Sequence, residues 1–163
     1  MGFLCITMTD PLSLAQYLNT ELISVQSDIS SRKKLLEKMA HLLTIPLDKK
    51  TKEKDIYHYL LEREKLGNTG IGNGVALPHS RAKEAKTAVI AIITLEEPID
   101  YDSIDRQPVD VAFGLLVPQE ANQEHLNLLA NIATLMSNND NKKALSSATS
   151  AEQIIELIET RCT

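Results

Sequence analysis

Residues 70–81 read GIGNGVALPHSR, a glycine-rich run followed by an apolar triplet, a proline and a histidine. Glycine lets a backbone take positive φ angles or approach a ligand closely. Pro78 fixes its own φ and biases Leu77 towards an extended conformation, so the imidazole of His79 projects with little backbone freedom. An imidazole held in this way can act as a nucleophile that carries a phosphoryl group. An ordinary structural histidine is the competing interpretation.

Two further side chains have the chemistry to join His79. Arg63 interrupts an apolar helical stripe that begins at Ile56, and a guanidinium on the inward side needs an anionic partner, either a carboxylate or a phosphate. His125 precedes Leu129 by one helical turn and stands near a predicted helix start, where the helix dipole favours a nearby anion. A salt bridge for Arg63 and a plain surface or core role for His125 remain alternatives. Together, two histidines and an arginine beside a glycine loop would suit phosphate chemistry.

The glycine spacing does not match nucleotide-binding motifs. In G-x-G-x-x-G the third glycine would fall at Val75, and no Gly-Lys-Ser/Thr follows as in a P-loop. The carboxylates Asp100, Asp102 and Asp105 lack the spacing of an EF-hand loop and are interpreted as a solvated turn. His41 and His58 lie in predicted helices without matching context, and we take both as structural or surface residues. We therefore expect neither a cofactor nor a metal.

Bulk properties narrow the class of protein further. The 163 residues are 43% hydrophobic and 24% charged, with a net charge of −5 and no strongly basic stripe, which argues against nucleic acid as a partner. The apolar start MGFLCITM lacks the basic region of a signal peptide, and Met8 offers an alternative start. No window approaches a membrane span. Cys5 and Cys162 are interpreted as free thiols in a reducing cytosol, so a cytoplasmic protein without membrane insertion is expected.

Hydrophobic periodicity predicts the elements that must position these side chains. Helices are expected at 10–18, from about residue 32 to 43, at about 50–66 with Gly67 as the cap, at 122–137 and at 150–162. Strands are expected at 22–26, 75–77, 87–95 and 108–118, with turn chemistry between the last two. In the 122–137 helix the residues predicted to face inward are Leu126, Leu129, Ile132, Ala133 and Met136. The fold class is α/β, a mixed β-sheet flanked by helices, in a single domain over 1–163 with its core at about 12–158.

Residues 63–79, REKLGNTGIGNGVALPH, resemble the signature of the type 2 IIA domain of the bacterial phosphoenolpyruvate-dependent phosphotransferase system. That signature is a helix ending in Arg-Glu, a glycine loop, and then Ala–aliphatic–Pro–His. The segments IDYDSIDRQPVDVAFGLLVP (99–118) and EHLNLLANIATLM (124–136) are similar in order and spacing. The resemblance extends from about Leu12 to about Ile158. Among the branches, DSIDRQPVD is most similar to the nitrogen-regulatory IIA proteins.

The resemblance implies a mannitol/fructose-type IIA fold and a role for each candidate residue. His79 would be the phosphorylated nucleophile, Arg63 the phosphate-binding arginine and His125 the second active-site histidine. Loop N–H groups at Gly72 and Gly74 would help to offset the charge of the phosphate. No metal is required, because the donor is itself a phosphohistidine. The family usually has Gly after the histidine, whereas Ser80 stands here, which either narrows the approach to His79 or adds a hydroxyl donor.

The implied donor is a histidine-containing phosphocarrier protein of the HPr or NPr kind. The leading hypothesis is a phosphocarrier of the nitrogen-regulatory system, whose phosphorylation state controls target proteins such as those of potassium transport or sensing. One alternative is a sugar-specific IIA that passes the phosphoryl group to a IIB domain. Another is a protein-binding module without chemistry, whose glycine loop is a docking surface.

Overall fold

The structure, a computed structural model, describes residues 14–161. Two 3₁₀ turns, η2 (Leu14–Tyr17) and η3 (Thr20–Leu22), precede the first strand. The strands are β1 (Ile23–Ser27), β2 (Gly70–Gly72), β3 (Val75–Ala76), β4 (His79–Ala82), β5 (Val89–Ile99) and β6 (Val109–Pro118). The α-helices are α1 (Arg32–Thr44), α2 (Glu53–Leu66), α3 (Gln123–Ser137), α4 (Asn139–Ser147) and α5 (Ala151–Thr160).

The strands form one mixed sheet in the order β1-β5-β6-β3-β2, with β4 also paired to β6. β5 and β6 are antiparallel, whereas β1 is parallel to β5, and β3 and β4 are both parallel to β6. Ala76 pairs with Ala112 and His79 with Leu115, so β3 and β4 keep one register along β6 across the break at Pro78. Because Pro78 has no N–H to donate, this break is where the chain leaves the ladder just before His79.

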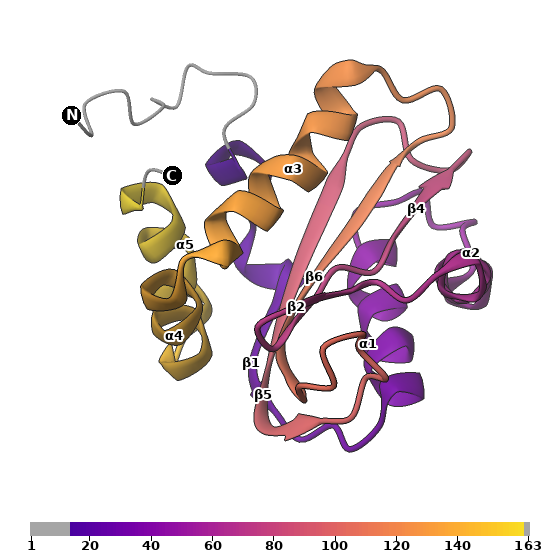
Figure 1. Ribbon diagram of the computed structural model, residues 1–163. Coiled ribbons are helices and arrows are strands. Elements are labelled where there is room, and N and C mark those ends of the chain that lie inside the picture. The colour runs from indigo at the N-terminus through magenta and orange to yellow at the C-terminus, as the bar shows by residue number, and fades with distance from the viewer. Residues whose placement is uncertain (1–13, 162–163) are drawn as a thin grey trace.

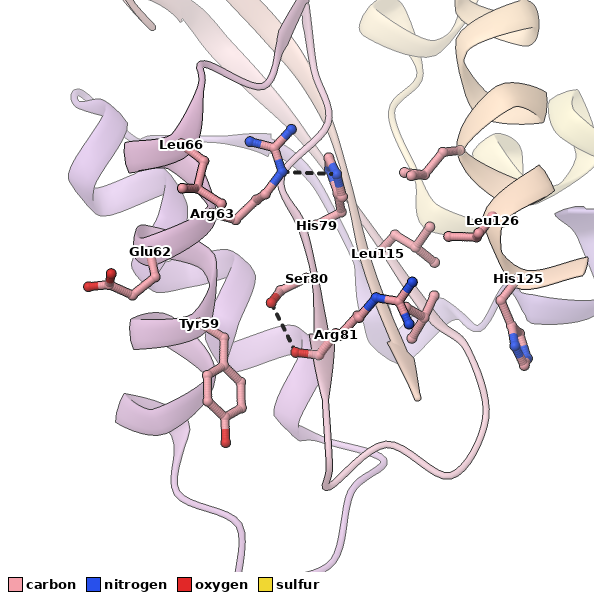
Figure 2. A pocket seen from close by; sticks show the side chains of 12 residues that line it. Tyr59, Glu62, Arg63, Leu66, His79, Ser80, Arg81, Leu115, His125 and Leu126 are labelled. Atoms are coloured by element: carbon pink, nitrogen blue, oxygen red, sulfur yellow. Dashed lines mark hydrogen bonds between the residues drawn. The ribbon is translucent and has the colours of Figure 1, made fainter. Parts of the chain in front are cut away.

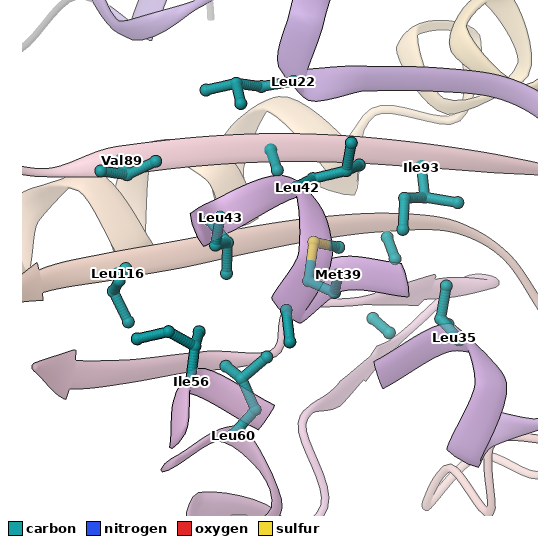
Figure 3. Close-up of a cluster of buried hydrophobic side chains, with 14 of the residues drawn as sticks. Leu22, Leu35, Met39, Leu42, Leu43, Ile56, Leu60, Val89, Ile93 and Leu116 are labelled. Carbon is teal, nitrogen blue, oxygen red and sulfur yellow. The ribbon is translucent and has the colours of Figure 1, made fainter. Parts of the chain in front are cut away.

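Helices cover both faces of the sheet. Figure 1 shows α1 and α2 on one side and α3, α4 and α5 on the other. Each face has its own core. The first core packs α1 and α2 against the sheet through residues such as Met39, Leu43, Ile56 and Leu60 (Figure 3). The second contains Phe113, Ile132 and Ile154. The predicted α/β class, with a mixed sheet flanked by helices, is confirmed.

Local sequence signals set several of the boundaries. The side chain of Ser31 accepts a hydrogen bond from Lys34 N at 3.2 Å and caps α1, and Ser150 does the same for α5 with Gln153 N at 3.1 Å. Gly67 follows α2 at the predicted place, and its N–H donates to the carbonyl of Glu64 at 3.2 Å. The expected helix ends at these positions are confirmed.

Other expectations differ from the structure. In α3 the predicted inward residues Ile132 and Met136 are buried. The prediction was wrong at Leu126, which is 38% exposed, and it missed the buried Leu128 and Leu135. The segment Glu96–Ile99, assigned to a turn, extends β5, and α4 was not anticipated. Of the expected 10–18 helix, the described part is the 3₁₀ turn η2. The interpretations of Cys5, Met8 and Cys162 fall outside the described residues.

Within residues 14–161, no helix combines the length and the apolar composition that crossing a membrane requires.

Candidate functional site

His79 is held at both ring nitrogens. Its Nδ1 lies 2.8 Å from the carbonyl oxygen of Leu77, and its Nε2 lies 3.3 Å from Nε of Arg63 (Figure 2). A carbonyl oxygen can only accept and a guanidinium N–H can only donate. These two contacts therefore select the neutral tautomer with its proton on Nδ1. The lone pair of Nε2 is left facing Arg63.

The environment of His79 favours the neutral ring. Burial is the largest cause that holds the pKa of His79 below its usual value, and the guanidinium of Arg63 acts in the same direction. The hydrogen bond to the Leu77 carbonyl and the carboxylate of Glu64 act against this lowering without reversing it. A neutral imidazole is the nucleophilic form, and the unprotonated nitrogen of this ring is Nε2.

The shifted pKa gives a first prediction. In an NMR titration of ¹⁵N-histidine-labelled protein, the His79 ring should protonate below the ordinary value of about 6.5. Because the pKa is lower in the folded chain than in the unfolded one, protonation favours unfolding, and the free energy of unfolding should fall as pH drops below that value. His79→Gln should remove this part of the pH dependence. A His79 midpoint above that of an unfolded peptide would contradict the assigned environment.

Arg63 lies in the last turn of α2 and is half-buried. Its Nη1 donates to the carbonyl of Gly67 at 2.8 Å, while its Nε points to His79. Among residues 14–161, no carboxylate lies within salt-bridge distance of Arg63, so the alternative of a structural ion pair finds no support there. The guanidinium is held by a carbonyl and a neutral ring, and neither partner neutralises its charge.

An open cleft of about 530 Å³ lies beside these two residues. Its lining residues come from α2, β4, β6 and α3: Tyr59, Glu62, Arg63, Leu66, His79, Ser80, Arg81, Leu115, Val117, His125, Leu126 and Leu129. Two leucines on its rim, Leu66 at 85% and Leu126, are unusually exposed for apolar side chains. Exposed apolar side chains beside a cleft are typical of a surface that meets another protein.

His125 lines the same cleft from the first turn of α3, but its ring points away from His79 in Figure 2. Its backbone N–H donates to the Asn122 side chain at 3.1 Å, which places it at the capped helix start as expected. Its Nδ1 is buried and has no hydrogen-bond partner. The structure therefore brings Arg63 and His79 together and places His125 near them without joining its ring to theirs.

The glycines expected to contact phosphate are not lining residues of the cleft. Both have positive φ, Gly72 at 93° and Gly74 at 77°, which fits the tight turn around Asn73. A Cβ on Gly74 would lie 2.9 Å from Nζ of Lys142, so its neighbours belong to α4 rather than to the site. The geometry gives no support to a phosphate contact at Gly72 or Gly74. It indicates a turn-forming role instead.

Two lining residues of the cleft, Arg81 and Ser80, and one buried neighbour of Arg63 add to what the sequence predicted. Arg81 lies two residues after His79, lines the cleft and donates to the carbonyl of Gln119 at 2.9 Å. The hydroxyl of Ser80 donates to the carbonyl of Arg81 at 2.9 Å, so in this structure it is turned to its own strand (Figure 2). The buried acid of α2 is Glu64, next to the arginine that the apolar stripe had singled out. Its place directly after Arg63 in the 63–79 segment is the one sequence feature that could have suggested it.

The side chains that could bind a metal ion are dispersed over residues 14–161. In the part of the chain that the structure describes, no group of three or more His, Cys, Asp or Glu side chains could hold a metal ion. The aspartates of the 100–105 turn serve the backbone instead, since Asp100 accepts from the N–H of Asp102 at 2.9 Å and Asp105 from that of Asn73 at 3.0 Å.

Comparison with known proteins decides the family. Residues 16–161 match the family described as "Phosphoenolpyruvate-dependent sugar phosphotransferase system, EIIA 2". The chain belongs to this family. The resemblance seen in the 63–79 segment is thereby confirmed, and as an EIIA 2 member the chain is a component of a phosphotransferase system.

Relatives of this EIIA 2 protein include nitrogen regulatory proteins. The chain is 40% identical over 128 residues to the nitrogen regulatory protein of Pseudomonas aeruginosa, covering 78% of this chain and 82% of the relative. The crystal structure of nitrogen regulatory protein IIA-Ntr from Neisseria meningitidis superposes with a TM-score of 0.83 at 34% identity, covering 89% of this chain and 98% of that one. The Escherichia coli IIA mannitol structure, at 18% identity and a TM-score of 0.72 over 86% and 98% of the two chains, shows the same fold.

Proposed function

We propose that this EIIA 2 protein accepts a phosphoryl group on Nε2 of His79 from a phosphohistidine on a small phosphocarrier protein. The observation that carries the proposal is the pair of contacts on the His79 ring. Nδ1 is committed to the Leu77 carbonyl, and Nε2 faces Arg63 at the cleft. Nε2 is therefore the ring nitrogen available for attack.

The transfer follows from this geometry. The lone pair of Nε2 forms a bond to phosphorus, the nitrogen–phosphorus bond of the donor breaks, and its electron pair returns to the donor imidazole. The His79 ring becomes positively charged while it forms the new bond. The Leu77 carbonyl, which accepts from Nδ1–H, stabilises that charge. Arg63 releases Nε2 and turns its N–H groups to the phosphoryl oxygens.

Docking of the donor is supported by the cleft rim. Leu66 of α2 and Leu126 of α3 are exposed at the two sides of the cleft, and they offer apolar surface that a partner can bury. Burial of this rim would exclude water from the phosphorylated ring, whose nitrogen–phosphorus bond hydrolyses readily. His125, which lines the same cleft, is the proposed second histidine that approaches the phosphoryl group.

The relatives favour a regulatory output over sugar transport. The Pseudomonas and Neisseria proteins are both named nitrogen regulatory proteins, and each comparison covers more than three quarters of this chain. We propose that phosphorylation of His79 changes which target protein the cleft rim binds. Passage of the phosphoryl group to a IIB domain is the second candidate, which the shared EIIA 2 fold supports.

One experiment separates these functions. The protein is incubated with phosphoenolpyruvate, the first enzyme of the system and a phosphocarrier protein, and its mass is measured. A gain of one phosphoryl group that is labile in acid and stable in base supports the proposal. If the mass does not increase, the remaining hypothesis is a binding module without phosphoryl transfer. Onward transfer to an added IIB domain, at a rate comparable with loading, would favour the transport candidate.

A further inference from the structure

Glu64 is a buried carboxylate one residue after Arg63, with only 7% of its surface exposed. All of its acceptor capacity is used. Oε2 accepts from the backbone N–H of Thr69 at 3.0 Å and from Nη2 of Arg32 at 3.1 Å. Oε1 accepts short hydrogen bonds from the hydroxyls of Thr69 and Tyr101. A buried carboxylate with four donors is rigidly placed, and none of these contacts belongs to the phosphoryl-accepting cleft.

The donors around Glu64 come from separate parts of the chain. Arg32 is the first residue of α1, and its guanidinium lies over the ring of Tyr101, 5.0 Å from the ring centre. Tyr101 is completely buried, and its carbonyl accepts from the side chain of Asn68 at 2.9 Å. Burial and the Glu64 carboxylate raise the pKa of Tyr101 above its usual value, so its hydroxyl stays protonated and donates. Glu64 thus connects the segment after α2 to the start of α1 and to the loop after β5.

A short path leads from Glu64 to the His79 ring. Glu64 holds Thr69 by both its backbone N–H and its hydroxyl. The carbonyl of Thr69 accepts from the N–H of Leu77 at 2.8 Å. The carbonyl of the same Leu77 accepts from Nδ1 of His79. Leu77, whose carbonyl selects the His79 tautomer, is therefore held through Thr69 by a carboxylate on α2.

Glu64 also lies beside the second group of the site. It occupies the last turn of α2, and its carbonyl accepts from the N–H of Gly67, whose own carbonyl accepts from Arg63. The same residue thus helps to fix the helix end from which Arg63 reaches Nε2. The side chain of Glu64 is therefore connected to His79 through Thr69 and Leu77, and its main-chain carbonyl to Arg63 through Gly67.

We infer that Glu64 is a positioning residue for phosphoryl transfer, which acts through Thr69 and Leu77 to keep the proton of His79 on Nδ1 and Nε2 unprotonated. This inference rests on the proposed function, because it assigns a role in the same reaction. The role is one of hydrogen-bond geometry. An amide at this position can still accept from Thr69 N–H, and the two hydroxyls can accept from its NH₂ group, whereas an apolar side chain leaves the Thr69 N–H and Arg32 without acceptors.

The test compares Glu64→Leu with Glu64→Gln by two measurements. The first is the His79 tautomer, read from long-range ¹H–¹⁵N spectra of the unphosphorylated protein. The second is the rate of loading from the phosphocarrier. We expect Glu64→Leu to give a mixture of tautomers and loading slowed by about 10- to 100-fold, as for a misplaced reacting group. Glu64→Gln should keep the Nδ1–H tautomer and load within about threefold of the unchanged protein.

The variant Ile154→Ala is the control that separates a general loss of stability from a specific effect at His79. Ile154 is fully buried in α5 in the second core, and its truncation destabilises the fold without contacting the site. It should leave the tautomer and the loading rate unchanged. If Glu64→Leu does not fold, the variant Thr69→Val replaces it. This variant removes the hydroxyl that donates a hydrogen bond to Glu64, and it should still give a detectable second tautomer.

The inference is overturned if Glu64→Leu keeps a pure Nδ1–H tautomer, if its loading rate matches that of Ile154→Ala, or if Thr69→Val leaves both readouts unchanged. Failure of the proposed function looks different. In that case the unchanged protein itself takes up no phosphoryl group, while the tautomer measurement can still show whether Glu64 controls the His79 ring.

Discussion

We expect His79→Gln to lose phosphoryl uptake by more than about 1,000-fold, the scale seen when a covalent nucleophile is removed. Glutamine fills much of the same space and can donate to the Leu77 carbonyl, but its amide has no nucleophilic lone pair. The fold should survive, because His79 is half-buried at the start of β4 and does not belong to either core. Loading is measured by the mass gain after incubation with the donor system.

The matched control for this prediction is His41→Gln. His41 lies on α1, where its ring pairs with Glu53 at 2.7 Å in an exposed position outside the cleft. It should load like the unchanged protein. Undiminished uptake by His79→Gln would place the phosphoryl group elsewhere, whereas loss in both variants would point to damage of the fold.

Arg63→Ala should slow loading by about 100-fold or more, the usual effect of removing one donor to a developing charge. In the structure its guanidinium is the positive group in contact with Nε2, where the phosphoryl oxygens arrive. Its side chain is only half-buried and forms no salt bridge in residues 14–161, so the free energy of unfolding should fall by less than about 1 kcal/mol. Stopped-flow loading and urea unfolding of the same samples measure the two quantities.

Arg81→Ala provides a matched comparison, since Arg81 lines the same cleft without contacting His79. Its loss should slow loading by less than about tenfold, as expected for a charge that steers association. Equal effects at Arg63 and Arg81 would mean that only the positive potential of the cleft matters. A large stability loss at Arg63 without a rate defect would assign it a structural role.

The elements could be predicted where the chain supplies its own local signals. Serine caps located the starts of α1 and α5, Gly67 located the end of α2, and the β-branched runs located β5 and β6. The inward face of α3 could not be placed in the same way. Leucines occur at 126, 128 and 129, and only the packing against β6 and the opening of the cleft decide which of them is buried.

Some residues of the candidate site could be predicted from the sequence, and others could not. The Pro78–His79 step and Arg63 were visible in the sequence because each breaks a local pattern, and the structure brings them into contact. Glu64 follows Arg63 in the 63–79 segment, but its buried role could not be predicted, because Arg32 and Tyr101 are distant in sequence and meet it only in the folded chain. Gly72 and Gly74 were singled out for their freedom of φ, which the structure uses for a turn.

Phosphorylation of His79 at Nε2 can be tested directly on the loaded protein. Histidine-labelled protein is phosphorylated by the donor system, and the phosphorus–nitrogen coupling is recorded in ¹⁵N spectra. We predict coupling at Nε2 of His79, with the proton retained on Nδ1 towards Leu77. Coupling at Nδ1 of His79, or at either nitrogen of His125, would contradict it.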